Sequence, residues 1–145
     1  MPNWCENTLT ITGDAKQLEK FIKKAKTKKT ALSLAKIYPE PDYSKIKVKK
    51  TFGKRYAEKG EEWWDWRIQN WGTKWDIEAY INYQDEGIIE YYFDSAWSPP
   101  LEFFKEASRQ YPDLQFRIKY DEPSMGFMGI AYANSGDLQE KSIDY

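Results

Sequence analysis

Two neighbouring segments with alternating apolar residues place the strongest constraint on the fold of this 145-residue chain. The first is "IEAYINYQ" at residues 77–84, and the second is "IIEYYFDSA" at residues 88–96. A period of two is typical of a strand with one buried face, and "DEG" between the segments is a turn sequence. The pattern predicts a β-hairpin whose first strand turns four residues toward the core, namely Ile77, Ala79, Ile81 and Tyr83.

The flanking segments alternate between strand and helix patterns. Residues 8–13 predict a strand with Leu9 and Ile11 inward, and residues 31–38 predict a short strand or an extended arm. One helix follows Asp14 as its cap, and a second helix follows Ser98 as its cap. Their predicted inner faces contain Leu18, Phe21, Ile22 and Ala25 in the first helix and Leu101, Phe104, Ala107, Ser108 and Tyr111 in the second.

The C-terminal third completes an α+β pattern. Residues 114–122 predict a strand, and residues 126–133 and 138–143 predict a C-terminal hairpin joined by "NSGD". The element order is that of a ferredoxin-like βαββαβ sandwich, an antiparallel sheet with two helices on one face. We expect a single domain over residues 1–145, with an insertion at about residues 27–76 between the first helix and the second strand. This insertion contains a Trp-rich helical excursion and, from Pro39 to Gly60, a charged and partly mobile stretch.

The composition excludes several classes of chemistry. Histidine is absent, which removes the commonest general base and zinc ligand, so we expect no catalytic residue, metal or cofactor. The one cysteine, Cys5, is expected to be a small buried apolar residue. The sequence contains neither a run of eighteen apolar residues nor a secretory signal at its start, which predicts a cytoplasmic protein with no membrane partner.

Charge is divided along the chain. Residues 1–60 contain 15 Lys/Arg and 6 Asp/Glu, a balance of +9, whereas residues 61–145 contain 7 and 17, a balance of −10. One half can therefore face an anionic partner that the other half repels.

Five of the seven tryptophans lie between residues 63 and 75. A helix over residues 61–70 would place Trp64 and Trp71 on one face, and we expect these rings and Trp75 to close the core between helix and sheet.

The remaining two rings of this block, Trp63 and Trp66, are expected at the surface beside Arg67, Asn70 and Lys74. Arg67 is four residues from Trp63, so its guanidinium can lie across an indole. Such a group suits the stacking of a base or the anchoring of a partner protein.

Four sequence blocks occur in a characteristic order: "MPNWC" followed by Asn7, "NWGTKWD" at residues 70–76, "FDSAWSPP" at 93–100 and "YDEPSMGFMG" at 120–129. Together they resemble the YubB ferredoxin-like domain family, small proteins of phages and plasmids whose functions are largely uncharacterised. The resemblance covers nearly the whole chain apart from about residues 42–59. It implies a ferredoxin-like fold, a mobile-element origin and a bacterial cytoplasm as workplace, and it supplies no catalytic mechanism.

Acidic residues complete the predicted binding site. Asp76 begins one strand, whereas Asp94, Asp121 and Glu122 end others, so two arrangements are open: the carboxylates converge, or they cap turns and accept local hydrogen bonds. The predicted binding residues are Trp63, Trp66, Arg67, Asn70, Lys74, Asp76, Asp94, Trp97 and Glu122.

These features predict a non-enzymatic binding protein that engages a host macromolecule, in the first place a host protein, and inhibits a bacterial defence system. One alternative is a nucleotide-signal sponge that stacks a base on Trp or Tyr while Arg67 or Lys74 meets the phosphate. A second is a single-stranded nucleic-acid binder that uses the basic half. A third is a carboxylate-metal hydrolase built on Asp76 and Asp94, and pairing of edge strands would give a homodimer.

Overall fold

A computed structural model describes residues 2–43 and 62–145 of the chain. Its elements are β1 (Trp4–Gly13), α1 (Ala15–Ala25), α2 (Leu34–Ile37), α3 (Glu62–Asn70), β2 (Ala79–Asp85), β3 (Ile88–Ala96), α4 (Leu101–Gln110), β4 (Leu114–Glu122), β5 (Phe127–Asn134) and β6 (Asp137–Asp144). The strands form one six-stranded antiparallel sheet in the order β2-β3-β1-β4-β5-β6. The predicted excursion from Pro39 to Gly60 falls largely on residues 44–61, which lie outside the described residues.

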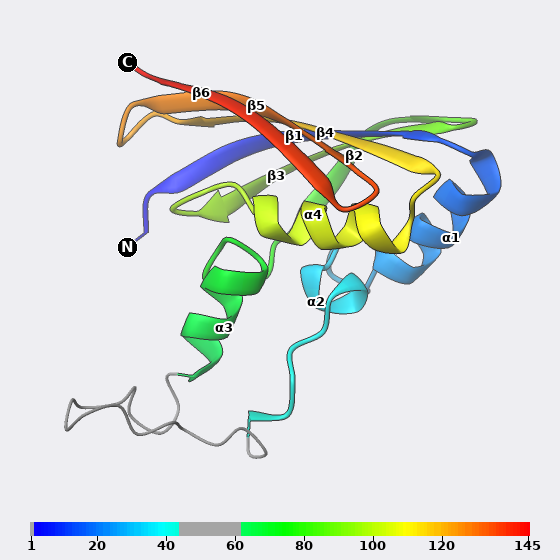
Figure 1. Ribbon diagram of the computed structural model, residues 1–145, viewed down its shortest axis with the longest axis horizontal. Helices are drawn as coiled ribbons and strands as arrows, with labels where there is room; N and C mark the ends of the chain where they lie inside the picture. Colours follow the sequence, from blue (N-terminus) through cyan, green and yellow to red (C-terminus); the bar gives the residue numbers. More distant parts are fainter. Residues whose placement is uncertain (1, 44–61) are drawn as a thin grey trace.

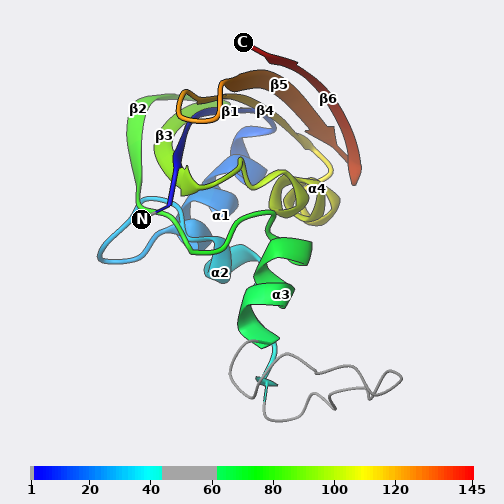
Figure 2. The same ribbon diagram turned by 90° about the vertical axis from the view of Figure 1, so that its left-hand side faces the viewer.

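The first four strands and two helices confirm the predicted ferredoxin-like arrangement. α1 and α4 lie along the same face of the sheet (Figure 1), and the sheet arches over them (Figure 2). The predicted C-terminal hairpin adds β5 and β6 beside β4. The described helices cover one face only, and we call the opposite face, which no described helix covers, the open face of the sheet.

The core follows the predicted alternation along the central strands. Leu9 and Ile11 of β1 are fully buried, and four alternate residues of β4 are buried in the same way: Leu114, Phe116, Ile118 and Tyr120. On α1, Leu18, Phe21 and Ala25 are buried, while Asp14 accepts a hydrogen bond from the Gln17 amide at 3.0 Å, as a helix cap does. Phe104 of α4 lies against three other core rings, those of Phe93, Phe103 and Phe116.

Three predictions of local structure are wrong. Residues 34–37 form the one-turn helix α2, where a strand or arm was expected. Ser98 does not cap α4, whose N-cap is Pro100, because the Ser98 hydroxyl donates instead to the Gly72 carbonyl at 2.6 Å. Ile81 and Tyr83 are exposed, since β2 is an edge strand with an irregular register between these two residues.

The insertion between α1 and β2 carries α2 and α3. In both ribbon views these two helices lie on the helical side of the sheet, and α3 projects away from it (Figures 1 and 2). The predicted binding residues of the tryptophan block therefore lie at the margin of the sandwich and not within its centre.

Candidate functional site

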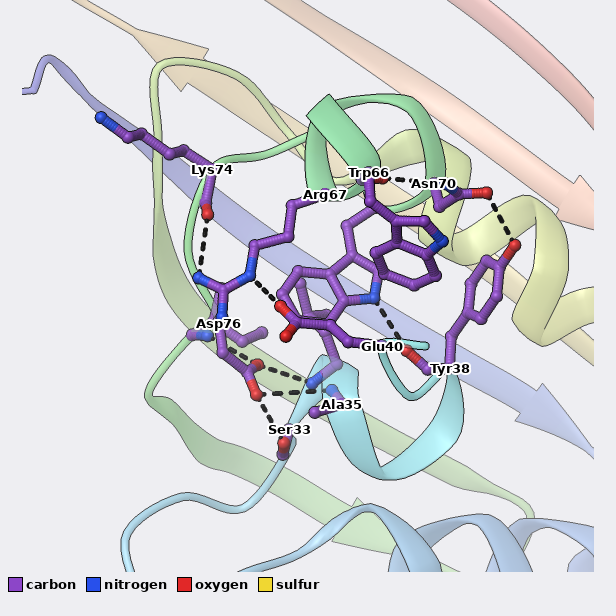
Figure 3. Close-up of polar contacts among 12 residues, drawn as sticks. Ser33, Ala35, Tyr38, Glu40, Trp66, Arg67, Asn70, Lys74 and Asp76 are labelled. Atoms are coloured by element: carbon purple, nitrogen blue, oxygen red, sulfur yellow. Dashed lines mark hydrogen bonds and ion pairs between the residues drawn. The ribbon is translucent and has the colours of Figure 1, made fainter. Parts of the chain in front are cut away.

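Arg67 is the centre of a network that fastens α3 to the rest of the molecule. Its guanidinium carbon lies 4.8 Å from the Trp63 ring centroid and 5.2 Å from that of Trp71, which confirms the predicted stacking on an indole. The guanidinium also pairs with Glu40, and Nη1 donates to the Lys74 carbonyl at 3.3 Å (Figure 3). Arg67 thus binds partners within the chain and is not free to meet a phosphate.

Trp66 and Asn70 belong to the same internal network. The Trp66 ring packs edge-on against Tyr38 at 5.2 Å and against Trp71 at 5.7 Å. Asn70 accepts a hydrogen bond from the Tyr38 hydroxyl at 2.8 Å (Figure 3). The Trp71 indole donates to the Tyr38 carbonyl at 2.9 Å. The expectation that Trp66 and Trp63 are surface rings is therefore wrong in part, because both are half-buried.

The chain reverses sharply after α3. Gly72 has a φ of 84°, and its amide donates to the Arg67 carbonyl at 3.1 Å. A side chain at this position would meet the Leu101 amide nitrogen at 3.2 Å. Glycine is therefore needed both for the left-handed conformation and for the close approach to α4.

Asp76 has a structural role. One carboxylate oxygen accepts hydrogen bonds from the amides of Leu34 and Ile77 at 2.7 and 2.8 Å. The other accepts from the Ser33 hydroxyl at 2.6 Å and from the Ala35 amide at 3.3 Å (Figure 3). The carboxylate therefore caps the first turn of α2, as the second of the two predicted arrangements requires.

Three other tryptophans form an exposed group, which we name the tryptophan row: Trp64, Trp75 and Trp4, together with Lys74. The Lys74 ammonium lies 4.3 Å from the Trp64 ring centroid and 5.0 Å from that of Trp75. The Trp75 and Trp4 centroids are 6.3 Å apart. The three rings are 45%, 36% and 46% exposed, so the prediction that Trp64 and Trp75 close the core is wrong, whereas Trp71 is buried as predicted.

A hollow of about 320 Å³ adjoins the Trp4 end of the row. Its lining includes Trp4, Tyr80 and Tyr92 together with Asp76 and Asp94. The structure thus brings two of the predicted acidic residues to one site, and the Tyr92 hydroxyl donates to Asp94 at 3.4 Å.

The last two predicted binding residues lie elsewhere. Trp97 is exposed in the turn after β3, where its amide donates to the Asn3 carbonyl at 2.8 Å. Glu122, another predicted binding residue, is fully buried and accepts a local hydrogen bond from the Met125 amide, as in the second of the two predicted arrangements. Glu122 also contributes, after burial itself, to raising the pKa of the buried Cys5 thiol to about 12.

Sequence reasoning missed Trp4 as a site residue. The signal was present, because Cys5, Asn7, Leu9 and Ile11 face inward and the same alternation turns Trp4 outward.

The open face of the sheet carries a second, larger hollow of about 550 Å³. Tyr92, Lys119, Ile130 and Lys141 are among its lining residues. No helix in the described part of the chain is long and apolar enough to span a bilayer. Within residues 2–43 and 62–145, no three Cys, Asp or Glu side chains are grouped so that they could hold a metal ion.

Comparison with known proteins identifies the fold and the family. The crystal structure of the protein Api92 from Yersinia pseudotuberculosis is similar to this chain with a TM-score of 0.67 and 12% sequence identity, and the match covers 100% of this chain and 98% of that one. At this identity the likeness shows the fold alone. No curated protein matches the sequence. The family model for the ferredoxin-like domain in Api92-like protein matches residues 70–144, more than half of the chain. The chain therefore belongs to the family defined by this ferredoxin-like domain of Api92-like proteins.

Proposed function

We propose that this chain is a non-enzymatic binding protein that engages another protein through the tryptophan row. The observation that carries the proposal is the exposure of Trp4, Trp64 and Trp75 in one connected group. Tryptophan is enriched among the residues that dominate protein–protein binding energy. Large contiguous apolar patches on the surface of a protein commonly mark interaction sites.

Lys74 holds two rings of the tryptophan row in position. Its ammonium lies over both Trp64 and Trp75, and its carbonyl is held by Arg67. Rings that are already positioned lose less conformational entropy when a partner arrives. The anchoring network of Arg67 thus supports the exposed row indirectly.

The partner that we propose is a protein of a bacterial host. The resemblance to the YubB family of phage and plasmid proteins favours a host protein in a bacterial cytoplasm, with inhibition of a defence system as the effect.

The test is a cross-linked pull-down from a bacterial host lysate, followed by binding measurements with the captured protein. Trp4→Ala and Trp75→Ala are expected to weaken binding at least about tenfold, as truncation of a hot-spot residue does. Tyr132→Ala is the matched control, because Tyr132 is a similarly exposed ring on β5 outside the row. Equal binding by all variants with unchanged thermal unfolding would contradict the proposal.

A second candidate function rests on the open face of the sheet. There, Tyr92 can stack a base while Lys119 and Lys141 meet phosphates, in place of Arg67 and Lys74, which are bound within the chain. Calorimetry with cyclic and linear nucleotides and with single-stranded oligonucleotides tests it. Binding that weakens steeply with salt and is lost in Lys119→Ala supports it, and no heat at high ligand concentration excludes it.

A further inference from the structure

The hollow beside Trp4 has walls made of aromatic rings from three neighbouring strands. Trp4 comes from β1, Tyr92 from β3 and Tyr80 from β2, and the two tyrosines are direct cross-strand partners. These rings are 46%, 37% and 64% exposed, so their surfaces are accessible to a ligand. An aromatic face carries partial negative charge and attracts cations.

Carboxylates give the same hollow a single sign of charge. Asp76, Glu78 and Asp94 line it, and none of the described residues in its lining is a lysine or an arginine. Asp76 is fixed by the amides and hydroxyl that it caps, and Asp94 is held by the Tyr92 hydroxyl. Asp76 and Asp94 are therefore positioned before any ligand arrives, which favours a cation over a neutral group.

Next to the hollow, the chain already places one of its own cations on aromatic rings. In the adjoining tryptophan row, the Lys74 ammonium lies 4.3 Å from the ring centroid of Trp64 and 5.0 Å from that of Trp75. Trp4 belongs to both surfaces, because it lies next to Trp75 and also lines the hollow. A partner that covers the row would bring its neighbouring side chains directly over the hollow.

We propose that the hollow lined by Trp4, Tyr80, Tyr92 and Asp94 receives a basic side chain, arginine or lysine, of the partner protein. The proposal rests on the proposed function, since the partner is the one that covers the tryptophan row. The partner would therefore present an apolar residue to the tryptophan row and, beside it, a cationic residue to the hollow.

The direct test uses short blocked peptides and the whole protein, without the partner. Acetyl-Gly-Arg-Gly-amide and acetyl-Gly-Lys-Gly-amide are titrated to about 10 mM, a range suited to millimolar affinity, while the indole N–H signal of Trp4 is followed by NMR. The control peptide has citrulline, a neutral isostere, in place of arginine. A saturable shift of the Trp4 signal with a basic peptide, and a much smaller shift with citrulline, is expected. No shift with either basic peptide, or equal shifts with citrulline, overturns the proposal.

Amide variants remove the charge while they preserve the shape. The double variant Asp94→Asn with Glu78→Gln keeps an acceptor for the Tyr92 hydroxyl and avoids Asp76, whose loss would disturb α2. It is expected to weaken peptide binding about tenfold, the effect of roughly one or two charge contacts. Asp144→Asn is the matched control, because Asp144 is an exposed carboxylate at the end of β6. Equal affinity of the double variant and the control overturns the proposal.

The same variants separate this proposal from the proposed function. If Trp75→Ala abolishes partner binding but the double amide variant binds the partner as the wild type does, the basic side chain is excluded and the tryptophan row stands. If neither variant affects any partner, the proposed function fails, and the peptide titration still decides whether the hollow takes a cation.

Discussion

Asp76 shows how a single side chain can organise a segment remote in sequence. Its carboxylate accepts four hydrogen bonds, three of them from Ser33, Leu34 and Ala35 at the start of α2. We expect Asp76→Ala to lower the free energy of unfolding by about 2 kcal/mol, the upper range for a lost helix cap. Urea denaturation measures the change. Asp94→Ala is the control and should stay within about 0.5 kcal/mol of the wild type, because Asp94 is exposed. Equal losses in the two variants would contradict the capping role.

Cys5 makes the free energy of unfolding fall as the pH rises in the alkaline range. The thiol is fully buried, and burial, with Glu122 as the second cause, raises its pKa to about 12. In the unfolded chain the pKa of a cysteine is about 8.5. The stability that the protonated thiol contributes is therefore fully present below about pH 8.5 and is lost as the pH rises toward 12.

The corresponding prediction concerns the slope of stability against pH. Cys5→Ala should give a flatter decline of the free energy of unfolding between about pH 8.5 and 10, measured by urea denaturation at several pH values. Above about pH 10 both proteins should lose stability, since burial also raises the pKa of Tyr91. Identical slopes in the two proteins below that pH would refute the role of Cys5.

At the scale of elements, α3 is attached mainly along one side. Trp66 and Arg67 face Tyr38 and Glu40, whereas Trp64 and Ile68 are exposed on the other side. The planar guanidinium of Arg67 contacts two indoles, pairs with a carboxylate and donates to a carbonyl, which an ammonium cannot reproduce.

We therefore expect Arg67→Ala to loosen α3 without unfolding the sheet. Amide hydrogen exchange over residues 62–70 should accelerate by roughly tenfold or more, and the strands should keep their protection. Arg67→Lys should be intermediate, because it keeps only the charge. Arg109→Ala is the control, since Arg109 pairs with Glu106 on the exposed side of α4. Unchanged exchange in α3 would show that the aromatic contacts alone hold it.

Elements with a clear period could be predicted from the sequence. The alternation of Leu114, Phe116 and Ile118 gives β4 and its inward face, because the strand crosses the core next to the centre of the sheet. α2 could not be predicted, since one helical turn is too short to show a period of 3.6 residues. The exposure of Ile81 also escaped prediction, because alternation cannot tell whether a helix covers the end of an edge strand.

The candidate site was predicted less well than the fold for a related reason. Rings at Trp63, Trp64 and Trp66 point around much of the α3 circumference, so periodicity cannot choose the buried face. The choice depends on contacts distant in sequence, those of Trp66 with Tyr38 and of Arg67 with Glu40. Tertiary contacts of this kind are not encoded in local spacing.

At the scale of the whole molecule, the two edges of the sheet differ in how strongly they discourage pairing with a strand of another chain. β6 carries Asp137, Glu140, Lys141 and Asp144, and charged residues discourage pairing with another chain. β2, at the opposite edge, has no charged residue from Ala79 to Gln84. Thr30 and Ala31 already bond to the amide and carbonyl of Ala79 at the start of β2. Beyond Ala79, β2 is therefore the edge of the described sheet at which a second copy of the chain would add.

Self-association at high concentration should accordingly proceed through β2. Ile81 is 43% exposed on this strand, and a lysine there would place a charge at the pairing edge while its aliphatic stem still covers the neighbouring apolar surface. We expect Ile81→Lys to lower the weight-average mass at high concentration in sedimentation equilibrium. Gln139→Lys on β6 should leave it unchanged, because that edge is already charged. If Gln139→Lys lowers the mass and Ile81→Lys does not, the contact between copies lies at β6. Charge on an edge strand would then not prevent pairing in this fold.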